Sequence, residues 1–268
     1  GVEGQQYPRM KDGLPSLLDL FARAGYRVGF YSQAPEIFYG LDWGAEPIAN
    51  LERFMAADRG EPRFLFLHYW HTHAPYGASD NLAHGQTLEL LRRGELPAVR
   101  SQYEAAVQRV FEYSVARVLE NLDLKRWCVL IFGDHGESWT RDEPYHGLTL
   151  RNSVLRVPLY FHIPNSGNPR PPRQLLSIVD LFPTLIDLFQ LPIQYRGFGR
   201  DLRQEQSPDY YAAQIDPVAN EVAGEDDPGR LLVGGGGRGR QWALFNPQVK
   251  MTYFEESKQT CLERTFDE

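Results

Sequence analysis

Acidic and histidine side chains follow two apolar stretches of this sequence, in an arrangement that could bind a metal ion. Asp134 and His135 come directly after the run Trp127–Phe132, and His146 follows shortly afterwards. A carboxylate oxygen and an imidazole nitrogen side by side are ligands that divalent cations accept. The same residues also suit a simple turn that ends a strand, so the spacing alone leaves both interpretations open.

Two predicted strands would bring these side chains to one place. The run 127–132 has charge before it and glycine after it, which is typical of a fully buried parallel strand. A second run, Arg63–Trp70, ends in the polar cluster His71–Tyr76, which contains His73. Because ligands bind at the carboxyl ends of strands in open α/β sheets, we expect both clusters at that edge.

The strongest helical pattern lies between the two apolar runs. Apolar residues recur every three or four positions from Val99 to Leu122, which predicts a long helix that covers the core. The alternation of helices and strands predicts an α/β fold. Shorter helices are predicted over 14–24 and 51–57, and a strand over 26–31.

Proline and aspartate mark the limits of the next elements. Pro158 lies within the predicted strand Val154–Ile163 and indicates an edge strand or a bulge, because proline has no N–H to donate. Asp180 is placed to cap the predicted helix 177–189. Pro183 is tolerated in that helix because it falls in the first turn.

The composition changes after about residue 201, and short strand patterns with turns between them predict a small antiparallel sheet. We therefore divide the chain into an α/β domain over 1–205 and a small antiparallel α+β subdomain over 206–268. The glycines at 234–237 predict a flexible turn, because no Gly-Lys-Ser/Thr motif of a phosphate-binding loop follows them. The predicted strands of this part cover 210–214, 230–233, 241–245 and 250–254.

Composition excludes several classes of partner. The 268 residues carry a net charge of -7, which argues against a nucleic-acid partner because such proteins need a clustered basic surface. No apolar stretch approaches the ~20 residues that a membrane-spanning helix needs. The two cysteines, Cys128 and Cys261, make neither a disulfide framework nor a zinc site, and we expect Cys128 to pack in the core.

Five motifs follow one another in order along the chain: Leu14–Leu18 with Ala24–Val28, His71–Tyr76, Gly133–Glu137, His146–Leu150 with Leu155–Leu159, and Val179–Leu185. Together they resemble the sulfatase branch of the alkaline-phosphatase-like superfamily, over nearly the whole chain. The resemblance implies an α/β fold with a mostly parallel sheet flanked by helices, incomplete at the N-terminus, and a small C-terminal antiparallel sheet.

The resemblance also implies roles for four residues. Asp134 matches the family's late metal-binding carboxylate, and His135 matches the neighbouring ligand position. His73 matches a histidine that contacts the substrate and can protonate the leaving oxygen. His146 matches a polar position that binds the non-bridging oxygens of the ester. Taken alone, His73 and His146 would each suit a structural role, and the shared motifs are what favour a catalytic one.

Other features of the family are missing from this sequence. The paired Asp residues, and the nucleophile segment whose Cys or Ser is converted to formylglycine, would precede Gly1. Ser32–Pro35 replaces a Lys-x-His segment, and His71 stands where most relatives have Asp. We therefore expect the chain to be the carboxyl-terminal majority of a longer protein. Alone it would lack a central strand, and we expect it to fold poorly or to be inactive.

Three functions are compatible with these residues. The first is metal-dependent hydrolysis of sulfate esters, small-molecule or glycan, with Ca as the divalent ion. The second is hydrolysis of a phosphodiester or phosphonate, or transfer of a phosphoalcohol group, with Mn, Zn or Mg; histidine ligands suit Mn and Zn better than Ca. The third is a non-catalytic binding or scaffold protein that keeps the fold. A Cys or Ser nucleophile upstream would favour the first function, and a Thr would favour the second. A chain with neither kind of nucleophile would favour the third function.

Overall fold

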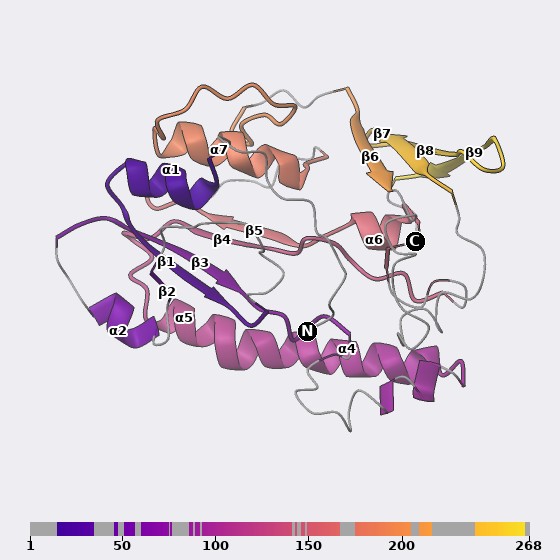
Figure 1. Ribbon diagram of the computed structural model, residues 1–268, viewed down its shortest axis with the longest axis horizontal. Helices are drawn as coiled ribbons and strands as arrows, with labels where there is room; N and C mark the ends of the chain where they lie inside the picture. Colours follow the sequence, from indigo (N-terminus) through magenta and orange to yellow (C-terminus); the bar gives the residue numbers. More distant parts are fainter. Residues whose placement is uncertain are drawn as a thin grey trace.

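Helices lie on both sides of a layer of strands in the computed structural model of the chain, and a separate antiparallel sheet from the C-terminal part lies at one end (Figure 1). Helices α1 (Leu17–Arg23) and α7 (Leu181–Leu188) cover one side of the strands, and α4 (Leu96–Val110) and α5 (Ala116–Glu120) cover the other. The residues that the structure describes are 15–34, 46–47, 51–56, 60–74, 76, 86–87, 89–91, 93–140, 143, 146–147, 149–166, 175–204, 209–215 and 239–265.

Three parallel strands form the first sheet, in the order β2-β1-β3. The strands predicted over 26–31 and 63–70 are confirmed as β1 and β3. The register pairs Ser32 with His68, so β1 and β3 end beside each other. The strand bounds are β1 (Arg27–Ser32), β2 (Glu46–Pro47) and β3 (Arg63–His68).

Helix α1 (Leu17–Arg23) packs on this sheet and confirms the first predicted helix. Ser16 and Asp19 form a capping box. The Asp19 N–H donates to Ser16 Oγ at 3.1 Å, and the Ser16 N–H donates to Asp19 Oδ2 at 2.8 Å. Phe21 stacks on Phe64 of β3 with ring centroids 4.0 Å apart. The predicted short helix is α2 (Leu51–Ala56), and the buried core beside α1 contains Leu18, Leu20, Phe21, Val28, Ile186 and Leu191.

The next two strands form a separate antiparallel pair. β4 (Val129–Phe132) pairs with β5 (Leu159–His162), and within the described part of the chain neither pairs with the first sheet. The expected mostly parallel sheet is therefore divided. The prediction of a fully buried parallel strand is wrong for β4, in which Phe132 is 43% exposed. The described part of 133–158 holds only the four-residue helix α6 (Asn152–Leu155) and no crossover helix, so the chain re-enters beside the end of β4 and runs antiparallel.

Helix α6 also changes the predicted strand Val154–Ile163. Its first residues belong to the helix, and β5 begins directly after Pro158. The Pro158 carbonyl accepts a hydrogen bond from the Gly133 N–H at 3.3 Å, which ties the start of β5 to the end of β4. In the described residues β5 pairs on one side only, as expected of an edge strand.

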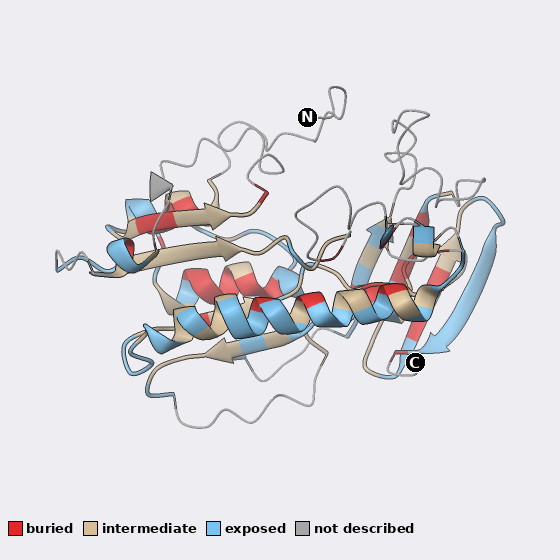
Figure 2. Ribbon diagram, turned by 90° about the horizontal axis from the view of Figure 1, so that it is seen from below, coloured by how far each residue is buried: buried red, intermediate tan, exposed pale blue. Residues whose placement is uncertain are grey.

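The long helix predicted from Val99 to Leu122 is confirmed as one continuous helix with a π-helical turn inside it. Figure 2 shows buried positions along one face of its first part, where Val99, Ala106 and Val110 are buried. None of the described residues in its last part is buried. No described helix is both long and apolar enough to cross a membrane. The three parts are α4 (Leu96–Val110), η2 (Phe111–Val115) and α5 (Ala116–Glu120).

The helix predicted over 177–189 is confirmed as the 3₁₀ helix η3 (Ile178–Asp180) followed by α7 (Leu181–Leu188). Its cap differs from the prediction. Ser177 occupies the capping position, and Asp180 completes a capping box by accepting from the Ser177 N–H at 3.0 Å. Pro183 lies in the first turn of α7, as expected.

Asp180 joins α7 to two later segments. Its side chain belongs to a residue only 1% exposed, and it accepts from the Arg200 N–H at 2.9 Å and from the Tyr211 hydroxyl at 2.5 Å. Burial raises the pKa of Tyr211, and the hydrogen bond to Asp180 and the charge of that carboxylate raise it further.

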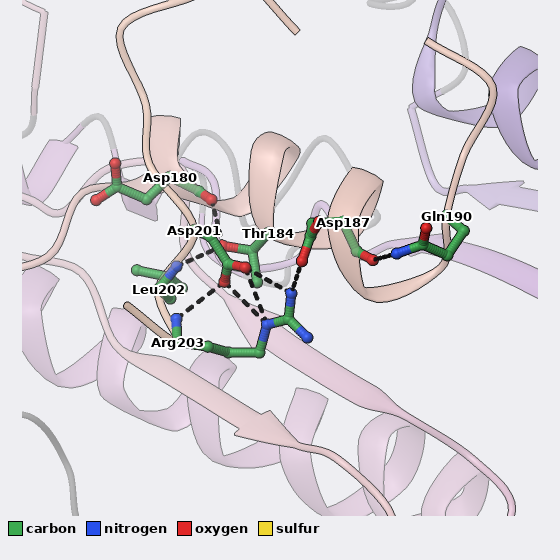
Figure 3. Close-up of polar contacts among 7 residues, drawn as sticks. All are labelled: Asp180, Thr184, Asp187, Gln190, Asp201, Leu202 and Arg203. Carbon is green, nitrogen blue, oxygen red and sulfur yellow. Dashed lines mark hydrogen bonds and ion pairs between the residues drawn. The ribbon is translucent and has the colours of Figure 1, made fainter. Parts of the chain in front are cut away.

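Residues 201–203 lie along α7 beside this junction (Figure 3). The Leu202 N–H donates to Thr184 Oγ1 at 2.8 Å, and the Thr184 hydroxyl donates to the Asp180 carbonyl at 2.6 Å. Arg203 forms ion pairs with Asp187 and Asp201 on the exposed side of the helix. The segment after α7 is therefore attached to the helix by several polar contacts.

The C-terminal residues form a four-stranded antiparallel sheet in the order β6-β7-β8-β9. The strands predicted over 210–214, 241–245 and 250–254 are confirmed. The predicted strand 230–233 and the glycine turn 234–237 lie outside the described residues, and the domain boundary at 205/206 stays a prediction. β9 was not predicted, because its residues are mixed in polarity and all exposed. The bounds are β6 (Tyr211–Ile215), β7 (Gln241–Phe245), β8 (Val249–Phe254) and β9 (Gln259–Arg264).

We expect Asp180→Ala to lower the free energy of unfolding by about 2–4 kcal/mol, because it leaves buried donors without an acceptor. The measurement is urea denaturation of the intact protein. Asp187→Ala is the matched control: its carboxylate is 64% exposed, and its ion pair should contribute less than about 1 kcal/mol. Equal unfolding free energies for the two variants would show that the Asp180 junction does not stabilise the fold.

Candidate functional site

A pocket lies where β3 and β4 end, although the two strands belong to different sheets. The two strands also begin close together, since the Arg63 guanidinium lies 5.5 Å from the centre of the Trp127 ring. The polar clusters after the two strands line this one pocket, as expected, but they do not share the edge of a single sheet. The described residues that line the pocket are His68, Tyr69, Trp70, Thr72, His73, Tyr103, Asp134, His135 and Glu137.

His73 is fixed by a ring contact and by a hydrogen bond. Its ring stacks on Trp70, with centroids 4.0 Å apart and an interplanar angle of 13°. Its Nδ1 lies 2.8 Å from the Ala74 carbonyl, which can only accept, so Nδ1 carries a proton and Nε2 is left for a substrate. Burial lowers the pKa of His73, and the neighbouring histidines lower it further. The Ala74 carbonyl and the Glu137 carboxylate act in the opposite direction.

Asp134 and His135 face each other in the pocket. Asp134 Oδ1 accepts from the His135 N–H at 2.9 Å, and Asp134 Oδ2 lies 3.7 Å from His135 Nε2. His135 Nδ1–H donates to the Gly136 carbonyl at 3.1 Å, which leaves Nε2 as the atom able to bind a metal ion. The two predicted metal ligands thus lie side by side, with the Asp134 side chain 77% exposed.

Glu137, which the sequence analysis did not identify, is the partner of His146. His146 Nδ1 lies 3.0 Å from Glu137 Oε1, and the Glu137 side chain is only 4% exposed. The other carboxylate oxygen, Oε2, is buried and has no hydrogen-bond partner among the residues that the structure describes. The sequence feature that could have identified Glu137 is its position two residues after His135, within the Gly133–Glu137 motif that carries the family resemblance.

The histidine rings lie close to one another. The ring centroids of His135 and His146 are 3.9 Å apart, and those of His73 and His146 are 5.6 Å apart. The structure therefore brings together all four predicted site residues, and it adds Glu137 to them. His71, which was noted in the same cluster as His73, is exposed and is not among the described residues that line the pocket.

One group of side chains has the composition of a metal site. His135, Glu137 and His146 each offer one ligand atom, and these atoms all lie within 4.8 Å of one another. Two imidazoles and one carboxylate are a ligand set used for catalytic Zn²⁺, and imidazole also suits other transition-metal ions. A buried carboxylate oxygen without a donor is costly, and a cation would compensate it. The donor set and the unpartnered Oε2 therefore fit a divalent ion.

Ser32 and His68, the paired last residues of β1 and β3, form a further contact beside the pocket. Ser32 Oγ lies 2.8 Å from His68 Nδ1 and accepts from the Ala34 N–H at 3.0 Å. Gln33 Oε1 accepts from the Trp70 N–H at 2.7 Å. Ser32 and Gln33 belong to the segment that stands in place of Lys-x-His. They hold the end of β3 and the backbone of Trp70, on whose ring His73 stacks.

A family model described as Sulfatase matches residues 45–191, which is more than half of the chain. The matched span contains His73, Asp134, His135 and His146. A comparison with curated proteins found no match.

Three solved structures are similar to this chain. A proposed sulfatase from Bacteroides thetaiotaomicron has a TM-score of 0.66 at 14% identity, over 96% of this chain and 68% of that one. A 2-O GAG sulfatase has a TM-score of 0.57 at 15% identity, over 96% and 68%. The phosphonate monoester hydrolase of Agrobacterium radiobacter has a TM-score of 0.63 at 13% identity, over 96% and 75%. At these identities the similarity concerns the fold.

We expect the His68 ring to titrate below the ordinary histidine value of 6.5, because burial lowers its pKa. Asp134→Asn should lower the His68 midpoint further, since the Asp134 carboxylate raises that pKa. Because the pKa of His68 is lower in the folded protein than in the unfolded chain, the unfolded chain binds the proton at a higher pH. His68 should therefore reduce the free energy of unfolding as the pH falls through 6.5.

The measurement is an NMR titration of the histidine signals in metal-free intact protein. Asp209→Asn, which changes an exposed carboxylate away from the pocket, is the control and should leave the His68 midpoint unchanged. A midpoint at or above 6.5, or the same midpoint in Asp134→Asn, would contradict the expected burial and charge effects.

Proposed function

The chain belongs to the sulfatase family, and from that membership we propose that it hydrolyses sulfate esters in the pocket at the ends of β3 and β4. The observation that carries the proposal is the gathering of Asp134, His135, His146 and His73 from two strand ends at one place. These are the side chains that a metal-dependent ester hydrolase needs for ligand binding and proton transfer. A small-molecule or glycan sulfate ester is the proposed substrate.

We propose that Asp134 and His135 hold a divalent ion, with Glu137 and His146 beside them. When bound, such an ion lowers the pKa of a nucleophile and neutralises charge on the oxygens of the ester. The imidazole nitrogens of His135 and His146 favour Zn or Mn over Ca. The unpartnered, buried Oε2 of Glu137 supports the same assignment.

The two remaining histidines have separate proposed roles. His73 presents Nε2 to the leaving group. Its lowered pKa makes the neutral ring the main form near neutrality, and an anionic ester bound beside it would favour the protonated ring that donates to the leaving oxygen. His146 donates from Nδ1 to Glu137, which fixes the ring, and its Nε2 would face the metal ion or the non-bridging oxygens of the ester.

We propose that the nucleophile lies outside the described residues. Burial raises the pKa of the Cys128 thiol to about 11, so this cysteine is protonated at neutral pH and suits a packing role. Cys261 is exposed on β9, in the C-terminal sheet. Neither cysteine is among the residues that line the pocket.

One observation favours a second function at the same site. The ligand group contains two imidazoles, and Ser32–Pro35 stands in place of a Lys-x-His segment. Mn or Zn bound in this way would also suit hydrolysis of a phosphodiester or phosphonate, or transfer of a phosphoalcohol group.

We expect Asp134→Ala in the intact protein to lose bound metal and to reduce turnover of an aryl sulfate by about 100-fold or more, since even second-shell changes cost 10–100-fold. Metal content is measured by mass spectrometry and turnover by release of the phenol. Asp209→Ala is the matched control. Unchanged metal content and turnover would overturn the metal assignment. Faster turnover of an aryl phosphonate than of the aryl sulfate by the unaltered protein would favour the second function.

We expect Glu137→Gln to raise the metal concentration needed for half-saturation by about 10–100-fold. The amide can still accept from His146 but no longer offers a negative charge to the ion. Calorimetric titration with Zn²⁺ and with Mn²⁺ measures the change. Glu120→Gln, an exposed residue of α5, is the control and should bind the ions as the unaltered protein does. Equal affinities for both variants would show that Glu137 takes no part in metal binding.

A further inference from the structure

The segment after His146 is held by side chains of the C-terminal sheet. Leu150 is buried, and both of its backbone polar groups bind this sheet. Its N–H donates to Gln241 Oε1 of β7 at 3.4 Å, and its carbonyl accepts from Lys250 Nζ of β8 at 2.6 Å. A third contact follows two residues later, where Asn152 Nδ2 donates to the Arg264 carbonyl of β9 at 2.9 Å. Three strands of the sheet thus contact residues 150–152.

The same segment is held from its other side by Glu143. This carboxylate is fully buried, and its Oε1 accepts from the Thr149 N–H at 2.9 Å. Its Oε2 accepts from the Thr149 hydroxyl and lies 3.6 Å from Arg151 Nε. Because His146 lies between Glu143 and Thr149 in the sequence, these contacts fix both ends of the loop that carries His146.

Helix α6 continues this connection to the metal-binding motif. The Gly136 N–H donates to the Val154 carbonyl at 2.8 Å. The helix and the motif are so close that a Cβ atom at position 136 would lie 2.1 Å from the Ser153 carbonyl oxygen. Gly136 separates His135 from Glu137, so any displacement of α6 would move both of these side chains.

Lys250 is an unusual residue to find in this connection. It is 1% exposed, and its ammonium group forms an ion pair with Glu263, the residue opposite it on β9. Burying a charge is costly, and an apolar side chain of similar length would fill the same space. An apolar side chain would, however, leave the buried Leu150 carbonyl without its donor. The Lys250 ammonium group therefore lies where it binds the backbone of the segment that follows His146.

We propose that Lys250 is a positioning residue. Through Leu150 and α6, it keeps His135, Glu137 and His146 in one group, so the C-terminal sheet determines the geometry of the candidate metal site. The effect on ester turnover rests on the proposed function, whereas the effect on the loop itself does not.

The test compares Lys250→Met with Lys258→Met, a change to an exposed lysine in the turn between β8 and β9. Hydrogen exchange of the intact protein is followed by NMR at the amides of Gly136, Leu150 and Val154. We expect exchange at these amides to be at least about tenfold faster in Lys250→Met and unchanged in Lys258→Met. Amides of β1 and β3 should be unaffected by either change, which shows that the variant is folded.

Two further measurements separate positioning from a purely local structural role. Zn²⁺ affinity, measured without any ester, should fall about tenfold in Lys250→Met. A local role would instead speed exchange only within β7 and β8 and leave both Gly136 and the Zn²⁺ affinity unchanged, and that result would overturn the proposal. Failure of ester turnover in the unaltered protein, with the exchange and Zn²⁺ effects present, would count against the proposed function alone.

A milder variant keeps the test decisive if Lys250→Met does not fold. Asn152→Ala removes the contact with the Arg264 carbonyl and leaves Lys250 in place. We expect faster exchange at Leu150 and Gly136, smaller than for Lys250→Met but in the same residues. Unchanged exchange at Gly136 in Asn152→Ala would contradict the connection from the sheet to the metal-binding motif.

Discussion

A carboxylate buried as deeply as that of Glu137 is costly unless donors or a cation compensate its charge. His146 compensates one oxygen, and the other has no hydrogen-bond partner in the described part of the chain. Imidazoles around the group lower this cost, and a dication shared with them would lower it further; His135 and His146 offer such imidazoles. The residues that follow β3 and β4 therefore form one site around the Glu137 carboxylate.

Other buried carboxylates of this chain are compensated differently. Glu143 binds the backbone and hydroxyl of Thr149, and Asp180 binds two backbone N–H groups and the Tyr211 hydroxyl. Asp180 ties together segments that are distant in the sequence, whereas Glu143 closes the short loop up to Thr149. Both oxygens of each acid bind donors of the described residues. Glu137 differs because its partner, His146, lies beside the histidines of the pocket and because its Oε2 has no hydrogen-bond partner among the described residues. This difference distinguishes Glu143 and Asp180, which stabilise the fold, from Glu137, which is suited to a role in the candidate metal site.

The sequence predicted those features that depend on local pattern. The first helix, β1, β3, the long helix and the strand before Asp134 all have strong periodicity or apolar runs, and all are confirmed as helices or strands. The sequence could not show that β5 returns antiparallel, because the direction of a strand depends on a crossover helix, and the described residues between β4 and β5 form only the short helix α6. It also missed β9, whose exposed residues carry no pattern, and Glu137, whose role depends on a histidine nine positions later being folded back onto it.

Charge also limits what this pocket can bind. None of the described residues that line it is Lys or Arg, while Asp134 and Glu137 both bring negative charge. An anionic ester would be repelled by these carboxylates at close range. Among the described residues, attraction would come from a bound dication or from protonated histidines, and the depressed pKa of His73 makes its ring a weak source of charge near neutrality. If the pocket binds an anionic ester as proposed, a bound ion would be the larger source of attraction, so metal binding and ester binding would be coupled.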